Sequence, residues 1–231
     1  MLEAIADDIW TIRAEFKVFG LIQLNGRATV VRLSDGSLWV HSPTKLTDEL
    51  KAQLDPLGPV RHLVAPSLFH HLYVGVWREA YPEALIYAPA GLQRKRPDLQ
   101  IDHELSSKDE TFRFSWSDEI AHQALFGMPK VREHLFYHKA SQTCLVTDLC
   151  FSFTEASGFT KLYLKLNRVY QRLGVPFVFQ MMMKDRAAFE RSLREVATWE
   201  VEALSLCHHA ILKGERLDEW RALLSAQLTR G

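Results

Sequence analysis

Residues 60–71 read VRHLVAPSLFHH, a short β-rich run that is followed by two adjacent histidines. The run over 60–66 predicts a strand, and the pattern over 69–81 predicts a helix. Residues 84–89 again predict a strand. A strand, a helix and a strand in this order are typical of α/β architecture.

Upstream of this segment the sequence predicts a hairpin and a capped helix. Residues 28–33 and 38–41 read as two strands joined at an Asp-Gly turn, which supplies the positive φ angles that a tight hairpin loop requires. Thr47 can cap a helix whose first turn is acidic, whose leucines share one face, and which ends before Gly58.

The second half of the chain predicts another batch of strands followed by helices. Residues 111–153 are mostly β in character, and a hairpin is expected between 133–138 and 144–148. Three further helices are expected, at 162–173, 185–202 and 217–228, and residues 203–207 form an apolar β-like run before the last of them. No repeat or low-complexity linker interrupts the chain, so we expect one domain over 1–231, with two sheets covered by helices on their outer faces.

Composition excludes several classes of partner. The chain has 231 residues, with 28 Lys and Arg against 28 Asp and Glu. This balance argues against a protein that coats nucleic acid or binds an anionic membrane surface, because such proteins carry a basic excess. No run approaches the ~18 apolar residues of a membrane span, and the acidic start does not resemble a signal peptide. Three cysteines without paired spacing favour a reducing, cytoplasmic location.

Other motifs limit the cofactors and partners. The chain contains no glycine-rich phosphate loop or dinucleotide fingerprint, so nucleotide cofactors have no support, and no Ser or Cys stands in a nucleophile elbow. Phe112, Phe114 and Trp116 alternate as in a strand, and this aromatic segment leaves room for a homodimer surface. The basic run at 94–96 either contacts a phosphate or forms a solvated loop.

Four of the ten histidines occur as two adjacent pairs, His70-His71 and His208-His209, and each pair directly follows an apolar β-like run. Asp148 ends a third such run. Ligand sites of α/β folds gather just past strand ends, so these side chains could converge into a first shell for one Zn(II) or Fe(II) ion. The alternative is a set of hydrogen-bonded core histidines with Asp148 capping a turn, because no H-E-x-x-H motif is present.

The order of these elements resembles the metallo-β-lactamase fold. More narrowly, the chain resembles an uncharacterised bacterial family on that fold, which is recognisable by LWVHSP at 38–43, APS at 65–67 with the histidine pair that follows, and AYP at 80–82. The resemblance covers nearly the whole chain. It implies an α/β fold of the αββα four-layer sandwich type, with any metal site at one edge between the two sheets.

Carried over by position, the resemblance implies that the first metal site of the superfamily is lost. The T-H-x-H-x-D-H motif falls on 65–71, where Pro66 and Leu68 replace two histidine ligands. The third histidine of that site would fall near Gly127, where the chain has none. His41 also replaces an aspartate that usually orients the ligand loop, so the surroundings of the ligands are altered too.

The second metal site is better preserved in this alignment. His71 matches its histidine, His70 replaces its aspartate, Asp148 matches the bridging aspartate, and His208 matches the last histidine, with His209 in place of the usual glycine. The metal ligands that we expect are therefore drawn from His70, His71, Asp148, His208 and His209. Whether His208 or His209 is the ligand stays open at this point. Cys207 is either an additional thiolate ligand or a buried small hydrophobe.

The resemblance implies two alternative functions. The first is a mononuclear metal-dependent hydrolase, with one divalent ion (Zn or Fe), a small-molecule substrate of unknown identity and unassigned catalytic residues. The second is a non-catalytic binding or interaction module that has lost the metal and the hydrolase activity. The sequence supports the fold for both, and ring nitrogens at about 2.0 to 2.1 Å from a common metal centre would support the first.

Overall fold

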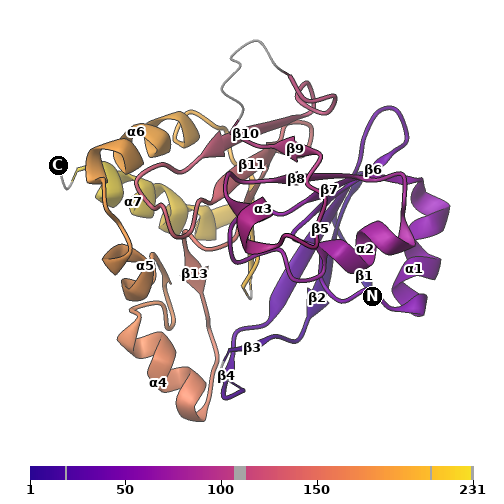
Figure 1. Ribbon diagram of the computed structural model, residues 1–231. Helices are drawn as coiled ribbons and strands as arrows, with labels where there is room; N and C mark the ends of the chain where they lie inside the picture. The colour runs from indigo at the N-terminus through magenta and orange to yellow at the C-terminus, as the bar shows by residue number, and fades with distance from the viewer. Residues whose placement is uncertain (19, 107–112, 209, 230–231) are drawn as a thin grey trace. The chain divides into compact units, whose positions relative to one another are not determined.

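The computed structural model shown in Figure 1 describes residues 1–18, 20–106, 113–208 and 210–229. The backbone forms two compact units, with residues 1–14 and 27–119 in unit 1 and residues 15–26 and 120–231 in unit 2. Each unit has its own hydrophobic core. That the units together form one domain over 1–231 stays a prediction. No helix in the described residues is both long enough and apolar enough to cross a membrane.

Unit 1 is built on a seven-stranded sheet with the order β1-β2-β5-β6-β7-β8-β9. These strands are β1 (Leu2–Ala6), β2 (Ile9–Ala14), β5 (Gly26–Arg32), β6 (Leu38–His41), β7 (Val60–Val64), β8 (Leu85–Ala88) and β9 (His103–Glu104). The run from β6 to β9 is parallel, whereas β5 and β6 form an antiparallel hairpin. The Asp-Gly turn of the predicted hairpin is confirmed, with Gly36 at φ 82°.

Three helices pack against one face of the unit 1 sheet: α1 (Asp48–Leu54), α2 (Val74–Ala80) and α3 (Leu92–Lys95). Leu54 and Trp77 are fully buried among strand residues such as Leu63 in this core. Thr47 caps α1 as predicted, because its hydroxyl oxygen accepts the N–H of Leu50 at 3.2 Å. Side chains alternate between the two faces of a strand, so Trp39 belongs to the opposite face of this sheet.

The helix predicted over 69–81 begins later, at Val74. Ser67 explains the difference, because its hydroxyl oxygen accepts the N–H groups of Phe69 and His70, each at 3.2 Å. These bonds hold the segment as bends and compete with a helical turn. The His70-His71 pair therefore lies in irregular chain before the helix, where adjacent side chains are not forced about 100° apart.

Unit 2 contains a five-stranded sheet with the order β10-β11-β12-β15-β16. Its strands are β10 (Ile120–Ala124), β11 (His134–His138), β12 (Thr143–Val146), β15 (Ala203–Leu206) and β16 (Ile211–Lys213). The hairpin predicted between 133–138 and 144–148 is confirmed by the antiparallel pairing of β11 with β12. β12 pairs with β15 in parallel. Two small sheets pair β3 (Lys17–Val18) with β4 (Ile22–Gln23), and β13 (Phe151–Ser152) with β14 (Leu173–Gly174).

The helices of unit 2 are α4 (Gly158–Leu166), α5 (Phe177–Met181), α6 (Arg186–Val196) and α7 (Leu217–Leu228). The helix predicted over 162–173 ends at Leu166, because Arg168 and Gln171 adopt left-handed backbone conformations at φ 60° and 56°. The helix predicted over 185–202 ends at Val196, and the strand predicted over 203–207 is confirmed as β15. Leu193 and Leu224 are among the side chains that these helices add to the core of the unit.

The aromatic segment expected to be a strand is a turn in the described residues. Phe114 and Trp116 lie outside the strands, with their rings stacked at 4.6 Å. Both rings pack edge-on against Tyr87 of β8, at 5.4 and 5.7 Å. Burial of these aromatic side chains in unit 1 therefore accounts for a pattern that resembled strand alternation. Phe112 lies outside the described residues.

Substitution of Gly127 tests the turn after β10. This glycine has φ 83°, and a Cβ atom there would lie 2.0 Å from the carbonyl oxygen of Asp185. Combining the cost of a left-handed residue with that of overpacking, we expect Gly127→Ala to lower the free energy of unfolding by about 3 kcal/mol. Gly214→Ala is the matched control, because Gly214 has φ 58° and no atom within 4 Å of the added Cβ. Equal losses of unfolding free energy in the two variants, measured by urea denaturation, would contradict the proposed clash.

Candidate metal centre

The loop between β7 and α2 holds the first histidine pair of the candidate site. The Ser67 hydroxyl fixes the backbone at His70, and the Nδ1 atom of the His70 ring lies 2.9 Å from the Oγ atom of Ser42. Ser42 directly follows β6, so the ends of two neighbouring parallel strands, β6 and β7, determine where this ring lies. Side chains that meet beyond the ends of parallel strands are the usual material of ligand sites in α/β folds.

His71 has a different partner. The guanidinium of Arg96 donates to Nδ1 of His71 at 3.2 Å and to its backbone carbonyl at 3.3 Å. Because arginine has no acceptor, Nδ1 must accept, and the neutral ring then carries its proton on Nε2. Burial lowers the pKa of His71 to about 4, and the charges of Lys95 and Arg96 add to the effect. A cation at this ring would have to displace Arg96 or remove the remaining proton.

The basic run at 94–96 is thus partly engaged in holding the histidine loop. The Nζ atom of Lys95 donates to the carbonyl of Leu68 and lies 5.2 Å from the centre of the Phe69 ring. Arg96 also forms an ion pair with Asp98 at 2.6 Å. Lys95 and Arg96 both bind the loop of their own unit, so a freely solvated loop does not describe them, and a phosphate contact of this run stays a prediction.

His208 follows β15 in unit 2 and is almost completely buried. Its Nδ1 atom lies 2.7 Å from the carbonyl oxygen of Asn25. Its ring also packs edge-on against the ring of Phe151, with the ring centres 4.6 Å apart. A carbonyl can only accept, so Nδ1 carries the proton and the lone pair of the neutral ring is on Nε2. This is the arrangement that metal-binding histidines commonly have, with one ring nitrogen held by a carbonyl.

Cys207 supplies a second donor atom next to His208. Its Sγ atom and a ring nitrogen of His208 lie within 4.8 Å of one another. The N–H of Cys207 donates to the carbonyl of Val146 at 2.8 Å, which extends the parallel pairing of β15 with β12 by one residue. Both readings of Cys207 in the sequence therefore remain compatible with its position, because it is buried and it also stands beside an imidazole.

Asp148 lies just past β12 and is buried beside a second carboxyl group, that of Glu133. The Oε1 atom of Glu133 accepts the N–H of Thr147 at 2.7 Å, the Thr147 hydroxyl at 2.8 Å and the N–H of Asp148 at 2.9 Å. Burial, together with the charge of Asp148, raises the pKa of Glu133 to about 7. Burial and the same aspartate also raise the pKa of Tyr163.

Glu133 is a residue that the sequence reasoning missed, although the hairpin register could have found it. His138 pairs with Thr143 and Phe136 pairs with Leu145, so each step back along β11 is matched by one step forward along β12. Continuing this register three residues beyond the Phe136–Leu145 pair places Glu133 opposite Asp148. A buried acidic residue facing the predicted metal carboxylate is a strong signal, because two close carboxyl groups perturb one another.

The candidate ligands of unit 2 come together only in part. In the described residues, Asp148 forms no group with both Cys207 and His208 whose ligand atoms all lie within 4.8 Å. His209 lies outside the described residues. At the positions aligned with the first metal site, Pro66 is buried and Leu68 is half-buried, and Gly127 leaves no space for a side chain.

Two comparisons identify relatives of this chain. A family model described as "Domain of unknown function (DUF4336)" matches residues 6–159, which is about two thirds of the sequence. The chain belongs to the DUF4336 family. No curated protein matches this DUF4336 chain in sequence.

The solved structures to which this DUF4336 member is similar include several metallo-β-lactamases. The enzyme DIM-1 has 14% identity and a TM-score of 0.65 over 98% of this chain and 96% of its own. The metallo-β-lactamase from Pontibacter korlensis has 10% identity and a TM-score of 0.64 over 97% and 98%. FIM-1 from Pseudomonas aeruginosa, in its mono-zinc form, has 14% identity and a TM-score of 0.62 over 99% and 96%. The mixed α/β fold is therefore that of the metallo-β-lactamases, as the sequence predicted.

Several other histidines are buried within their own units. His41 stacks on Trp39 with ring centres 5.9 Å apart, and burial lowers its pKa to about 3. His134 stacks with His122 across the β10–β11 pair, and burial lowers its pKa to about 3 as well. His62 is 6% exposed, and its Nδ1 atom lies 2.9 Å from the Tyr87 hydroxyl. Burial in unit 1 excludes a surface role for His62.

The His62–Tyr87 pair predicts that the protein loses stability in acid. Burial lowers the pKa of folded His62 to about 4, with His103 and Arg61 acting in the same direction and Asp35 opposing them. The unfolded chain has a histidine pKa of about 6.5, so it binds a proton that the folded chain does not bind between about pH 6.5 and 4. Stability is therefore fully present above about pH 6.5 and falls as the pH is lowered through this window.

His62→Gln should keep a hydrogen-bonding partner for Tyr87 but remove the titration. Between pH 7 and pH 4, we expect the wild type to lose up to about 3 kcal/mol more unfolding free energy than this variant. Urea denaturation at both pH values measures the difference. His103→Gln is the comparison variant, because it removes only one of the smaller influences on the His62 pKa and should therefore keep most of the pH dependence. Identical pH dependence of wild type and His62→Gln would refute the assignment.

Proposed function

We propose that this DUF4336 chain binds a single metal ion and derives from metal-dependent hydrolases, with a small molecule of unassigned structure as its substrate. The observation that carries the proposal is the His208 ring, whose Nδ1 atom is bound to the Asn25 carbonyl while a thiol lies next to the ring. The fold supports it, since similar structures are metallo-β-lactamases. One of these, FIM-1, is described in a mono-zinc form, which is a precedent for a single ion on this fold.

We take His70 and His208 from the ligand set that the sequence resemblance implies, and we add Cys207 because its thiol lies next to the His208 ring within unit 2. Both imidazoles have Nδ1 next to a polar oxygen of their own unit, Ser42 Oγ for His70 and Asn25 O for His208. This leaves Nε2 of each ring as the proposed ligand atom, and the arrangement matches the outer partners that orient metal-binding histidines. Two imidazoles and one thiolate suit Zn(II) better than Fe(II), because the thiolate is a soft ligand.

The proposed set differs from the full set expected from sequence. His71 is less suited as a ligand because the Arg96 guanidinium occupies its acceptor nitrogen. Asp148 remains a candidate outer partner whose position depends on Glu133, through the bond to the Asp148 N–H. Between the two histidines of the second pair, the oriented ring supports His208 over His209 as the ligand.

Three protein ligands would leave an open coordination position, which is the property of catalytic rather than structural zinc sites. An ion held there would supply Lewis acidity and a bound water of lowered pKa. The chain's own contribution would be to orient both rings through Ser42 and Asn25 and to keep His71 neutral through Arg96. Hydrolysis of a small ester, amide or related bond is the reaction class that fits this chemistry.

A non-catalytic binding module is the second candidate function. Two observations favour it: Pro66 and Leu68 stand at first-site ligand positions, and Arg96 places a permanent positive charge beside His71. In this case His70 and His208 would act only as hydrogen-bonded structural residues. Metal binding separates the two candidates, because a structural cluster has no need for an ion.

We expect the protein purified without a histidine tag, and then loaded with zinc, to retain about one ion per chain after dialysis. A His70→Ala, His208→Ala double variant should lose this ion, whereas His71→Ala should retain it, because Arg96 already binds the His71 ring. Elemental analysis and competition with a chelator measure content and affinity. Ser42→Ala should weaken zinc binding by about 10- to 100-fold, as expected for loss of an outer partner.

His138→Gln is the control variant for this experiment. His138 is also a buried histidine of unit 2, but its Nδ1 atom is bonded to the hydroxyl of Ser141 in its own hairpin, at 2.8 Å. Zinc binding should be unchanged in this variant. Equal metal content in wild type, control and the His70→Ala, His208→Ala protein would end the metal proposal and leave the non-catalytic module. Loss of the ion in His71→Ala would instead favour the ligand set expected from sequence.

A further inference from the structure

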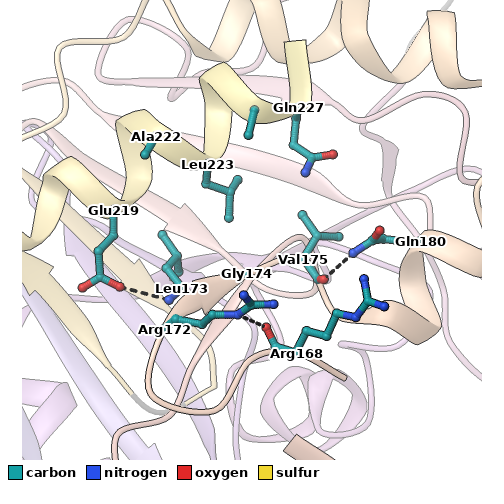
Figure 2. A pocket seen from close by; sticks show the side chains of 11 residues that line it. Arg168, Arg172, Leu173, Gly174, Val175, Gln180, Glu219, Ala222, Leu223 and Gln227 are labelled. Atoms are coloured by element: carbon teal, nitrogen blue, oxygen red, sulfur yellow. Dashed lines mark hydrogen bonds between the residues drawn. The ribbon is translucent and has the colours of Figure 1, made fainter. Parts of the chain in front are cut away.

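Unit 2 contains a second concave site that the proposed metal chemistry does not use. It is a cavity of about 360 Å³ between α7, the chain from Arg168 to Val175, and Gln180 of α5. Its apolar lining comes from Leu173, Gly174, Val175, Ala222, Leu223 and Ala226. Figure 2 shows Ala222, Leu223 and Gln227 of α7 on one side and Arg168 and Arg172 on the other. The lining residues lie beyond residue 159, outside the part that the family model matches.

The charged groups of this cavity are unequally satisfied. Glu219 is neutralised, because its carboxylate accepts the N–H of Leu173 at 2.9 Å and the Nε–H of Arg216 at 3.1 Å. Arg168 and Arg172 form no ion pair with any residue that the structure describes. The guanidinium of Arg168 lies over the Phe177 ring at 5.5 Å, which orients it without cancelling its charge. The cavity therefore has two uncompensated positive charges on one side.

The backbone holds these two arginines in place. Arg168 has a left-handed conformation at φ 60°, which is uncommon for a residue other than glycine and is often found at functional sites. Its backbone carbonyl accepts the Nε–H of Arg172 at 2.7 Å, so the Arg172 side chain is linked to the Arg168 backbone. Gly174 permits this approach, because a Cβ atom there would lie 2.9 Å from the same carbonyl oxygen. The backbone of the turn that carries both arginines is therefore constrained.

We propose that this cavity binds a small organic phosphate ester, with the phosphate at Arg168 and Arg172 and an apolar body against Val175, Leu223 and Ala226. A planar guanidinium donates two parallel hydrogen bonds to phosphate oxygens, and two guanidinium groups balance a phosphate dianion. The volume is in the range of small-molecule sites, which combine an apolar lining with a few polar groups. This site lies wholly within unit 2 and is independent of the proposed metal centre.

Phenyl phosphate is the probe that tests the proposal. Inorganic phosphate and phenol, which represent its charged part and its apolar part, are the comparison ligands. Isothermal titration of the full chain should give saturable binding of phenyl phosphate, at least about tenfold tighter than of inorganic phosphate, because the ring buries apolar surface. Arg168→Gln with Arg172→Gln should weaken phenyl phosphate binding by about tenfold or more, since charge-assisted bonds are lost. Added salt should weaken binding in the wild type.

Two further variants control for folding and for surface charge. Ala226→Leu should weaken phenyl phosphate more than inorganic phosphate, because it narrows the apolar part of the cavity and leaves both arginines intact. Arg221→Gln should leave binding unchanged, because Arg221 is an exposed arginine of α7 that pairs with Asp218 and does not line the cavity. The proposal is overturned if phenyl phosphate does not bind saturably, if the double arginine variant binds it as well as wild type, or if inorganic phosphate binds equally tightly.

Discussion

The carboxyl group of Glu133 is the buried acceptor on which the ligand-bearing end of unit 2 depends. A single oxygen, Oε1, accepts two backbone N–H groups and one hydroxyl, all from Thr147 and Asp148. These donors lie just past the end of β12, where the ladder of the sheet no longer satisfies the backbone. An unpaired buried polar group costs about 1–3 kcal/mol, so removing this acceptor would penalise three donors together. The chain past β12 is therefore fixed in one conformation.

The same strand end also determines where the second donor pair lies. The Val146 carbonyl, the last of β12, accepts the N–H of Cys207, so β15 ends level with β12. Unit 1 uses an equivalent device, since the Ser67 hydroxyl accepts the N–H of His70 just past β7. In both units a buried side chain accepts backbone N–H groups just past a strand end and thereby orders a candidate ligand residue, Asp148 through Glu133 and His70 through Ser67. The N–H of Cys207 is instead bound by the extended sheet pairing, through the carbonyl of Val146.

The sequence predicts those features whose cause lies within a few residues. The Asp-Gly hairpin, the Thr47 cap and the β11–β12 hairpin were correct because turn chemistry and alternation determine them locally. Errors arose where a local side chain or a strained residue overrides periodicity, as Ser67 does before α2 and Arg168 does after α4. The observed helix boundaries differ from the predicted ones by several residues, although the helices themselves are present.

The partners that define the candidate site are beyond the reach of spacing. Asn25 and His208 are 183 positions apart, and nothing in the residues around Asn25 indicates that its carbonyl meets an imidazole. Arg96 and His71 are 25 positions apart, and the basic run at 94–96 resembled a solvated loop. Glu133 was within reach, because the predicted hairpin register pairs it with Asp148. Residue type thus indicated the candidate donors, which stay a prediction, while the orientation of their rings required the fold.

The contrast between His70 and His71 shows how one loop can keep a histidine pair and still change its chemistry. Arg96 remains charged at any ordinary pH, so the ring that it binds is held neutral and is a poor partner for a second cation. His70, whose Nδ1 atom faces a hydroxyl instead, has no such permanent charge at that nitrogen. An aspartate at position 70 would bring a negative charge to the loop, whereas histidine is neutral and softer. Under the proposed ligand set, the donor on this loop is therefore His70 and not His71.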